Sequence, residues 1–309
     1  MEDKKSLELM EKNAQRLKEY TQGRMSSSSL IIKYFKRIAK YISLGNWSYA
    51  AYAFKRAFRV AVTKKDDSKD IVAESSLEIP ISEKLVIYTV LFGNYDDLKE
   101  PLYVTPNCDY YILTNQEVKT DSVWKKFPIE KLEEKTRGFS NLEKARYFKL
   151  HPHLLFPEYK YSMFIDANLQ MVTDMRPVFK QLENNFIAIH NQPGRDCVYQ
   201  EATEIIVIGK ADKAPVIEQM KAYKKEGFPK HYGLFRTCVV VREHNNEQCI
   251  KLMELWWKEI NAFTKRDQLS FTYALWKMGL TKNAVSNLGY DPRTNPRFIE
   301  SVHTSHKLQ

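Results

Sequence analysis

The sequence predicts an α/β fold, in which helices flank a mostly parallel sheet and a basic helical hairpin stands at the N-terminal end. Three observations support this: apolar runs recur along the chain, helical patterns lie between them, and cations are concentrated before residue 70. A continuous apolar run is typical of a strand buried on both faces, as in parallel sheets. Strands that alternate with helices indicate such a sheet.

The expected strands and helices of the sheet all fall after residue 84. Strands are expected at 85–92, 110–114, 161–165, 186–189, 205–208 and 238–241. Helices are expected at about 141–151, 212–225, 246–262 and 267–279. In a sheet of this kind ligands bind beyond the carboxyl ends of the strands, so residues that follow a strand are candidates for chemistry.

Charge is unevenly distributed along the 309 residues. Residues 1–70 hold 16 Lys/Arg against eight Asp/Glu, a net charge of +8, whereas residues 71–309 hold 32 against 30, a net charge of +2. A nucleic-acid-binding domain usually carries its basic patch on the fold itself, which argues against nucleic acid as the main partner. We expect a basic helical segment (1–70), a polar linker (71–83) and one main domain (84–309).

The N-terminal hairpin is predicted from two amphipathic patterns within residues 30–65. Phe35 and Ile38 share one helical face, and Trp47 and Phe54 share another. The same stretch holds nine Lys/Arg and no Asp or Glu. Three interpretations stay open: a cap packed on the main domain with a solvated basic face, an anchor on an anionic membrane surface, or a docking face for a protein.

Neither a membrane span nor a secretion signal is expected. No apolar run approaches the roughly 18 residues of a spanning helix, and the first residues, MEDKKSLELMEKN, contain no apolar signal core. The four cysteines are scattered without a CxxC pair, which predicts reduced thiols and no zinc site or disulfide framework. We therefore expect a cytoplasmic protein, peripheral on the inner face of the plasma membrane.

The strongest local signal for chemistry is Asp166-Ala167-Asn168, which follows an apolar strand directly. Side chains two residues apart at a strand end can point the same way. Asp166 and Asn168 could thus offer oxygen ligands to Mn²⁺ or Mg²⁺ bridging a diphosphate, and such an ion stabilises a departing phosphate. The alternative is an ordinary turn or helix cap.

A basic segment and a polar loop flank that signal in the sequence. On the helix expected at 141–151, Lys144, Arg146 and Lys149 could hold phosphates, or form a solvated basic face. In the loop 190–201, Arg195 could bind a phosphate or an acceptor carboxylate. Asp196 or Glu201 could act there as general base, and the alternative is a salt-bridged surface loop.

Two further candidate groups stand near the C-terminal end. Asp267 opens an expected helix, where a capping role and a catalytic role are compatible. His303, His306 and Lys307 could complete a metal site and clasp a diphosphate, and the alternative for them is a frayed tail.

In this order, the motifs resemble a glycosyltransferase-like family that was long classed as a domain of unknown function. Plant pectin- and mucilage-related proteins typify the family, and bacterial polysaccharide clusters also contain members. The resemblance covers about residues 84–307. Its most specific parts are the FGNYD turn (92–96), the HNQPGRDCVYQEA loop (190–202) and the RDQLSF helix start (266–271).

The resemblance implies a GT-A fold with a Rossmann-like nucleotide half, a DxD-type metal motif that binds Mn²⁺ or Mg²⁺, and a nucleotide-sugar donor, with a UDP-sugar favoured. Asp166 and Asn168 would stand for the DxD motif, and the amide of Asn168 departs from its second carboxylate. His303 or His306 would be the late metal ligand. The implied donor-binding residues include Tyr88, Thr89 and Tyr95 near the base and ribose, Asp109 after the second strand near the base, and Lys144 and Arg146 near the diphosphate.

We therefore expect a glycosyltransferase that builds a surface polysaccharide, such as a capsule, on a glycan or lipid-linked acceptor. Asp267 or Glu201 would serve as base or stabiliser near that acceptor. One alternative is a non-catalytic scaffold that binds glycan or partner enzymes, because Asn168 lacks a carboxylate. A second is a sugar phosphotransferase on the same fold.

Overall fold

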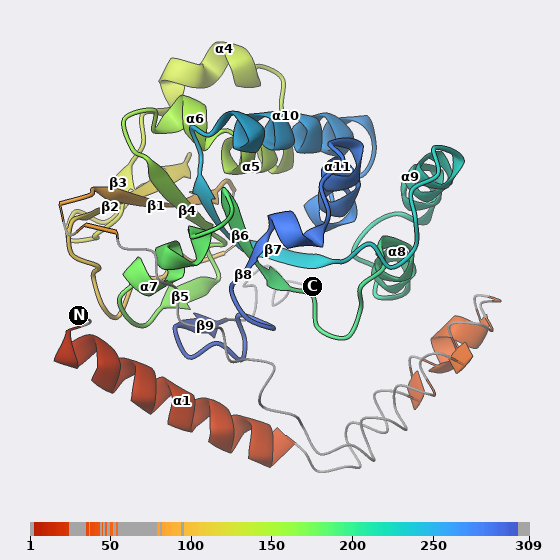
Figure 1. Cartoon of the computed structure of the whole chain (residues 1–309), viewed down its shortest axis with the longest axis horizontal. Coiled ribbons are helices and arrows are strands. Elements are labelled where there is room, and N and C mark those ends of the chain that lie inside the picture. Colours follow the sequence, from red (N-terminus) through yellow and green to blue (C-terminus); the bar gives the residue numbers. More distant parts are fainter. Residues whose placement is uncertain are drawn as a thin grey trace.

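The computed structural model describes residues 3–24, 35–36, 38–43, 45, 47, 50–51, 54, 79–80, 82–93 and 96–301. Within this part of the chain, the centre is a seven-stranded sheet in the order β3-β2-β1-β4-β7-β6-β8 (Figure 1). The strands are β1 (Leu85–Leu91), β2 (Cys108–Thr114), β3 (Lys125–Lys126), β4 (Tyr161–Ile165), β6 (Ile187–Asn191), β7 (Phe235–Glu243) and β8 (Ser286–Asn287).

Most neighbouring strands run parallel. The pairs β1–β2, β1–β4, β2–β3 and β6–β8 are parallel, whereas β7 runs antiparallel to both β4 and β6. The expected α/β class with a mostly parallel sheet is confirmed. A small second sheet joins β5 (Leu169–Met171) to β9 (Phe298–Glu300).

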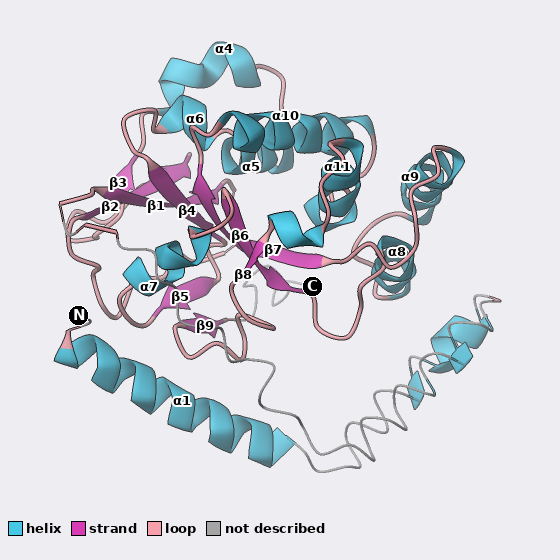
Figure 2. Cartoon of the chain, viewed as in Figure 1, coloured by secondary structure: helices cyan, strands magenta, loops and turns pink. Residues whose placement is uncertain are grey.

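Helices and the small second sheet cover the two faces of the main sheet (Figure 2). The helices of the main domain are α4 (Glu133–Thr136), α5 (Asn141–Leu150), α6 (Pro152–Leu155), α7 (Arg176–Phe179), α8 (Val198–Val207), α9 (Lys213–Lys225), α10 (Glu247–Ala262) and α11 (Phe271–Lys277). Short 3-10 turns are η2 (Ile129–Leu132), η3 (Lys180–Leu182), η4 (Asp267–Leu269) and η5 (Lys282–Ala284).

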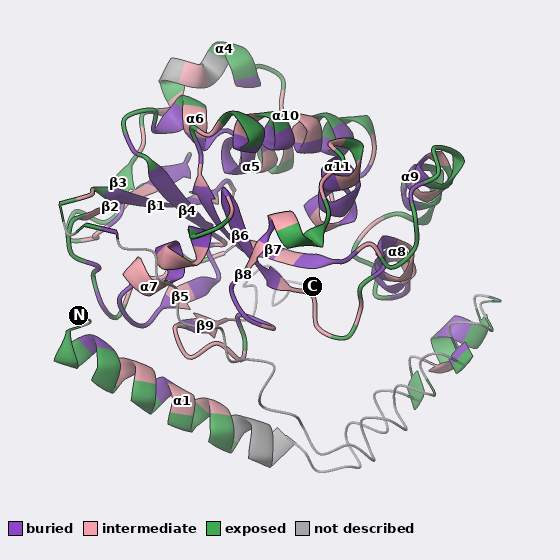
Figure 3. Cartoon of the chain, in the orientation of Figure 1, coloured by how far each residue is buried: buried purple, intermediate pink, exposed green. Residues whose placement is uncertain are grey.

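The central strands are buried on both faces, which explains their continuous apolar runs (Figure 3). Tyr88 and Phe164 face a cluster that includes Trp256 of α10, whereas Ile87 and Met163 face the α7 side. Alternate residues of one strand thus enter different clusters, as the two-residue period of a strand requires.

Capping groups fix where two long helices begin. Ser140 and Glu143 form a reciprocal capping box at the start of α5. The side chain of Asn246 accepts from the backbone amides of Gln248 and Cys249 at the start of α10. These helices confirm the expected ones at 141–151 and 246–262, as α9 confirms 212–225 and η4 with α11 confirms 267–279.

The strand expected at 205–208 is wrong, because Ile205 belongs to α8. The buried residues of α8 recur at helical spacing, with Val198, Ala202 and Ile205 on one face against α9 and α11. A four-residue apolar run does not distinguish a buried strand from the buried face of a helix.

The N-terminal helix α1 (Lys4–Arg24) contacts the main domain. Ser6 hydrogen-bonds the hydroxyl of Thr173, and Asn13 donates to the carbonyl oxygens of Pro296 and Phe298 at 2.7 Å and 3.2 Å. No helix of the described residues is both long and apolar enough to cross a bilayer. The predicted boundary at 70 lies outside the described residues, and only residues 79–80 and 82 are described just before the one at 83. Both boundaries stay predictions.

Candidate functional site

The turn after β4 carries Asp166 and Asn168 at the carboxyl end of the strand, as predicted. The Asp166 amide donates to the carbonyl oxygen of Cys238 at 2.9 Å, and the Leu169 amide donates to that of Asp166 at 2.9 Å. Asp166 is half-buried and Asn168 is buried. Their oxygens suit a hard divalent cation. Among the described residues, no group of three His, Cys, Asp or Glu is arranged to hold a metal, so the two would need a further ligand.

The end of the described chain is fixed to this turn. The Asn168 side-chain amide donates to the carbonyl oxygen of Ser301 at 3.1 Å, and the Ser301 amide donates to that of Asn168 at 2.9 Å. A carboxylate at position 168 could not donate this bond at neutral pH. The departure from a two-carboxylate motif therefore has a structural reason. His303, His306 and Lys307 lie outside the described residues.

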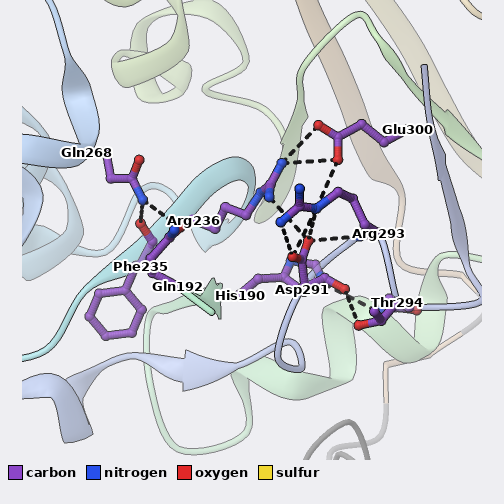
Figure 4. Close-up of polar contacts among 10 residues, drawn as sticks. His190, Gln192, Phe235, Arg236, Gln268, Asp291, Arg293, Thr294 and Glu300 are labelled. Carbon is purple, nitrogen blue, oxygen red and sulfur yellow. Dashed lines mark hydrogen bonds and ion pairs between the residues drawn. The ribbon is translucent and has the colours of Figure 1, made fainter. Parts of the chain in front are cut away.

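A network of arginines and carboxylates, drawn in Figure 4, was not predicted from the sequence. It lies beside the turn, because Glu300 pairs with Leu169. Arg236, near the start of β7, lies between Asp291 at 3.3 Å and Glu300 at 2.9 Å. Arg293 contacts the same two carboxylates, at 2.6 Å and 3.5 Å. The only local signal was a charged residue at the edge of an apolar strand.

Electrostatics keep Asp291 of this network ionised. Burial alone would raise the pKa of Asp291, but Arg293 and Arg236 hold it below its usual value. The adjacent His190 is fully buried, and burial lowers its pKa to about 3, so its ring is neutral. The register of β6 against β7 shifts between Ile189 and His190, an irregularity typical of strands beside active sites.

Asp267 packs against the face of β7 that carries Thr237, which is opposite the face that carries Arg236. There it is buried in an ion cluster. Its carboxylate accepts from Lys149 Nζ at 2.5 Å and from the Thr237 hydroxyl at 3.0 Å, and Arg146 Nη1 lies 3.6 Å away. Burial would raise the pKa of Asp267, but Arg146 and Lys149 lower it below its usual value. The side chain of Lys149 is only 1% exposed, so it is an internal partner of Asp267 and offers no surface to a diphosphate.

The loop after β6 holds two further predicted groups in ion pairs. Arg195 Nε donates to Glu201 at 2.6 Å, and both side chains are largely buried. The exposed Asp196 accepts from His231 Nδ1 at 2.7 Å. The loop is thus ordered by salt bridges, which was the stated alternative, and the catalytic roles of Asp196 and Glu201 stay predictions.

Tyr88 and Thr89, two predicted nucleotide contacts, are buried inside the fold. Tyr88 is fully buried, its hydroxyl donates to the carbonyl oxygen of Lys149 at 2.7 Å, and Arg242 donates to that hydroxyl at 2.5 Å. Thr89 is 1% exposed. In this conformation neither has surface for a ligand, and Tyr95 lies outside the described residues.

Asp109 begins β2 instead of following it, which corrects its expected place. It pairs with Val86 near the amino ends of β1 and β2, at the edge opposite the Asp166 turn. Lys84 and Lys125 lie 2.7 Å and 3.1 Å from its carboxylate, and Tyr159 donates to it. These partners satisfy the charge and the hydrogen bonds of the carboxylate, so a nucleotide is not needed to explain it.

The carboxyl ends of β1 and β2 meet where a donor base was expected. Gly93 accepts from Gln116 and donates to Asn115 Oδ1 at 3.1 Å. A Cβ at Gly93 would lie 3.2 Å from Asn141, so α5 begins beside this edge. Lys144, in the first turns of α5, is half-buried and has no ion pair within the described part of the chain.

Comparisons with known proteins identify a plant relative of this chain. The probable hexosyltransferase MUCI70 of Arabidopsis thaliana is 25% identical over 266 residues, which cover 76% of this chain and 44% of that protein. This chain therefore spans less than half the length of that relative.

Solved structures that are similar to parts of this chain include two sugar transferases. The apo WbbM bifunctional glycosyltransferase has a TM-score of 0.42 at 14% identity, covering 70% of this chain and 40% of that one. Mouse xyloside xylosyltransferase 1 in its apo form has a TM-score of 0.38 at 10% identity, covering 68% and 85%. A family profile, the TOD1/MUCI70, glycosyltransferase-like domain, matches residues 57–303, and on that extent the chain belongs to this family.

Proposed function

We propose that this chain is a glycosyltransferase that moves a hexosyl group from a nucleotide sugar, with a UDP-sugar favoured, to a glycan. The observation that carries the proposal is the Asp166–Asn168 turn, which ends a central strand at the edge of the sheet in a chain of the glycosyltransferase-like family. Ligands of α/β sheets bind at this edge.

In the proposed site Asp166 and Asn168 would hold Mn²⁺ or Mg²⁺. The ion would neutralise charge on the departing diphosphate. The bonds between Asn168 and Ser301 keep the start of the tail beside this turn, so His303, two residues further on, is the proposed third ligand. Lys144, at the start of α5, is the remaining cation proposed for the phosphates, since Lys149 and Arg146 already contact Asp267.

The test is a binding screen of the full chain against UDP, GDP, ADP and CMP, with and without Mn²⁺. We expect one nucleotide to raise the melting temperature, and Mn²⁺ to increase that shift. Release of the same nucleotide from its sugar donor should follow. If a folded sample shows no shift with any nucleotide, the chain is not a nucleotide-sugar transferase and a scaffold role is favoured. A phosphosugar product would identify a phosphotransferase.

We also propose that the N-terminal hairpin binds an anionic membrane surface and so brings the site to a lipid-linked acceptor. Tyr41 and Ala50 are buried against Val207, and the Tyr41 hydroxyl donates to Glu204 of α8. Three other aromatic side chains that the structure describes in this segment are exposed instead: Phe35 by 60%, Trp47 by 69% and Phe54 by 57%. Exposed aromatics in a stretch of sequence that holds nine Lys/Arg suit a peripheral anchor on an inner membrane face.

Replacing Phe35, Trp47 and Phe54 by serine should reduce cosedimentation with vesicles of anionic lipid at least about tenfold, because buried apolar area supports such binding. The matched control replaces three exposed apolar residues of the main domain, Leu102, Val104 and Leu154, by serine. Equal binding of the two triple variants would show that the hairpin is no anchor.

A further inference from the structure

Two cations beside the candidate site form no ion pair within the described residues. The nearby acidic groups are already shared: Asp291 and Glu300 with Arg236 and Arg293, Glu201 with Arg195, and Asp267 with Arg146 and Lys149. Lys210, just after α8, and Arg266, just before η4, have neither a hydrogen bond from their side chains nor an ion pair there. The Nε atom of Arg266 is buried without a partner.

These two cations belong to the same edge of the fold. η4 contacts both α8 and β7, which brings the segments of Lys210, Arg266 and Arg236 together. Gln268 of η4 donates to Gln192 at 2.8 Å and to the carbonyl oxygen of Phe235 at 2.9 Å, so η4 is fixed to the ends of β6 and β7. Lys210 is exposed to solvent. Desolvation and the nearby charges of Arg266 and Arg236 lower its pKa, and Glu201 and Glu300 only partly offset this.

We propose that Lys210 and Arg266 bind an anionic sugar residue of the acceptor, one that carries a carboxylate or a phosphate. A buried guanidinium nitrogen without an acceptor, such as Nε of Arg266, is costly unless a ligand supplies an acceptor. Guanidinium and ammonium groups bind carboxylates and phosphates by charge-assisted hydrogen bonds. The inference rests on the proposed transferase function and names the class of its acceptor.

The position of the pair favours the acceptor over the diphosphate of the donor. Lys210 and Arg266 lie on the β7–β6 side of the sheet, whereas the carboxyl ends of β1 and β2, beside Lys144, lie on the other side of β4. The Asp166–Asn168 turn ends β4, between the two. A donor spanning β1 to β4 would leave the β7 side for a second substrate.

The experiment titrates the full chain, with UDP and Mn²⁺ present, with three probes of equal length: an oligouronide, a phosphorylated oligosaccharide and a neutral oligosaccharide. We expect one anionic probe to bind at least about tenfold more tightly than the neutral one. Lys210→Met and Arg266→Gln should each weaken that binding about 10-fold to 100-fold, the effect of losing a hydrogen bond to a charged group. Which anionic probe binds identifies the carboxylate or the phosphate as the source.

Three controls separate the outcomes. Lys213→Met removes an exposed cation a few residues away and should leave binding of the probe unchanged, and Lys210→Arg should retain most of it. Affinity for UDP should be equal in all variants. A parallel loss of UDP affinity would assign the pair to the diphosphate, and equal binding of anionic and neutral probes would overturn the inference. Absence of binding to UDP, GDP, ADP and CMP alike in the unaltered chain would instead contradict the proposed function.

Discussion

Replacing Asp267 by asparagine is expected to lower the free energy of unfolding by about 3–5 kcal/mol, the cost of leaving one partner of a buried ion pair alone. Lys149 is 1% exposed on its side chain and its ammonium lies 2.5 Å from Asp267. Its remaining neighbours are the rings of Phe164 and Trp256, 4.7 Å and 6.0 Å from the nitrogen. Aromatic faces attract a cation but do not replace a carboxylate.

Urea denaturation of Asp267→Asn, Lys149→Met and the double variant measures the coupling energy between the two side chains. The double variant should recover much of the stability, because an apolar side chain then fills the space of the unpaired ammonium. Arg146, 3.6 Å from Asp267, belongs to the same network. The coupling energy measured between Asp267 and Lys149 is therefore a lower bound on the coupling energy of the whole cluster. A loss below about 1 kcal/mol in Asp267→Asn would contradict the burial of the pair.

Acid should affect this pair in a defined direction. Despite burial, which would raise the pKa of Asp267, the nearby cations Arg146 and Lys149 hold it below its usual value, so the unfolded chain binds more protons there than the folded one. The contribution of Asp267 is full above its unfolded pKa of about 3.9 and is lost as the pH falls through the folded pKa. Stability measured from pH 5 downwards should fall less steeply in Asp267→Asn, and equal slopes would contradict the assignment.

The fold was largely predictable because its central strands are buried on both faces. Runs such as Leu85–Leu91 and Tyr161–Ile165 have no polar face and stand out in the sequence. The strands β5 and β9 were not predictable, since three-residue strands carry no period. Ile205 was misplaced because the packing of α8 on α9, and not the local sequence, makes its run helical.

The site was predictable only where one segment carries it. Asp166 and Asn168 follow a strand directly, and that signal is local. The network of Arg236, Asp291 and Glu300 joins residues separated by up to 64 positions, and no local pattern announces it. Asp109 was misplaced because it precedes the apolar run 110–114 in the sequence, so it lies at the amino end of β2, at the edge opposite the Asp166 turn.

Asp166→Ala is expected to weaken Mn²⁺-dependent nucleotide binding by about 100-fold or more while leaving the fold intact. Loss of a group that merely supports a metal ligand already costs about 10-fold to 100-fold in metal affinity, and Asp166 is the only carboxylate of the turn. The fold should survive, because the backbone amide and carbonyl of Asp166, which bond Cys238 and Leu169, remain in alanine.

Calorimetric titration of nucleotide with and without Mn²⁺ measures this loss, and the melting temperature without ligand checks the fold. Asp121→Ala, which removes an exposed carboxylate elsewhere, is the matched control and should bind as the unaltered chain does. Metal-independent binding should be retained in Asp166→Ala, because binding of the base and ribose would not require the ion. If the variant binds nucleotide and Mn²⁺ normally, then Asp166 holds no metal, and the turn that ends β4 has only the structural role of anchoring Ser301 through Asn168.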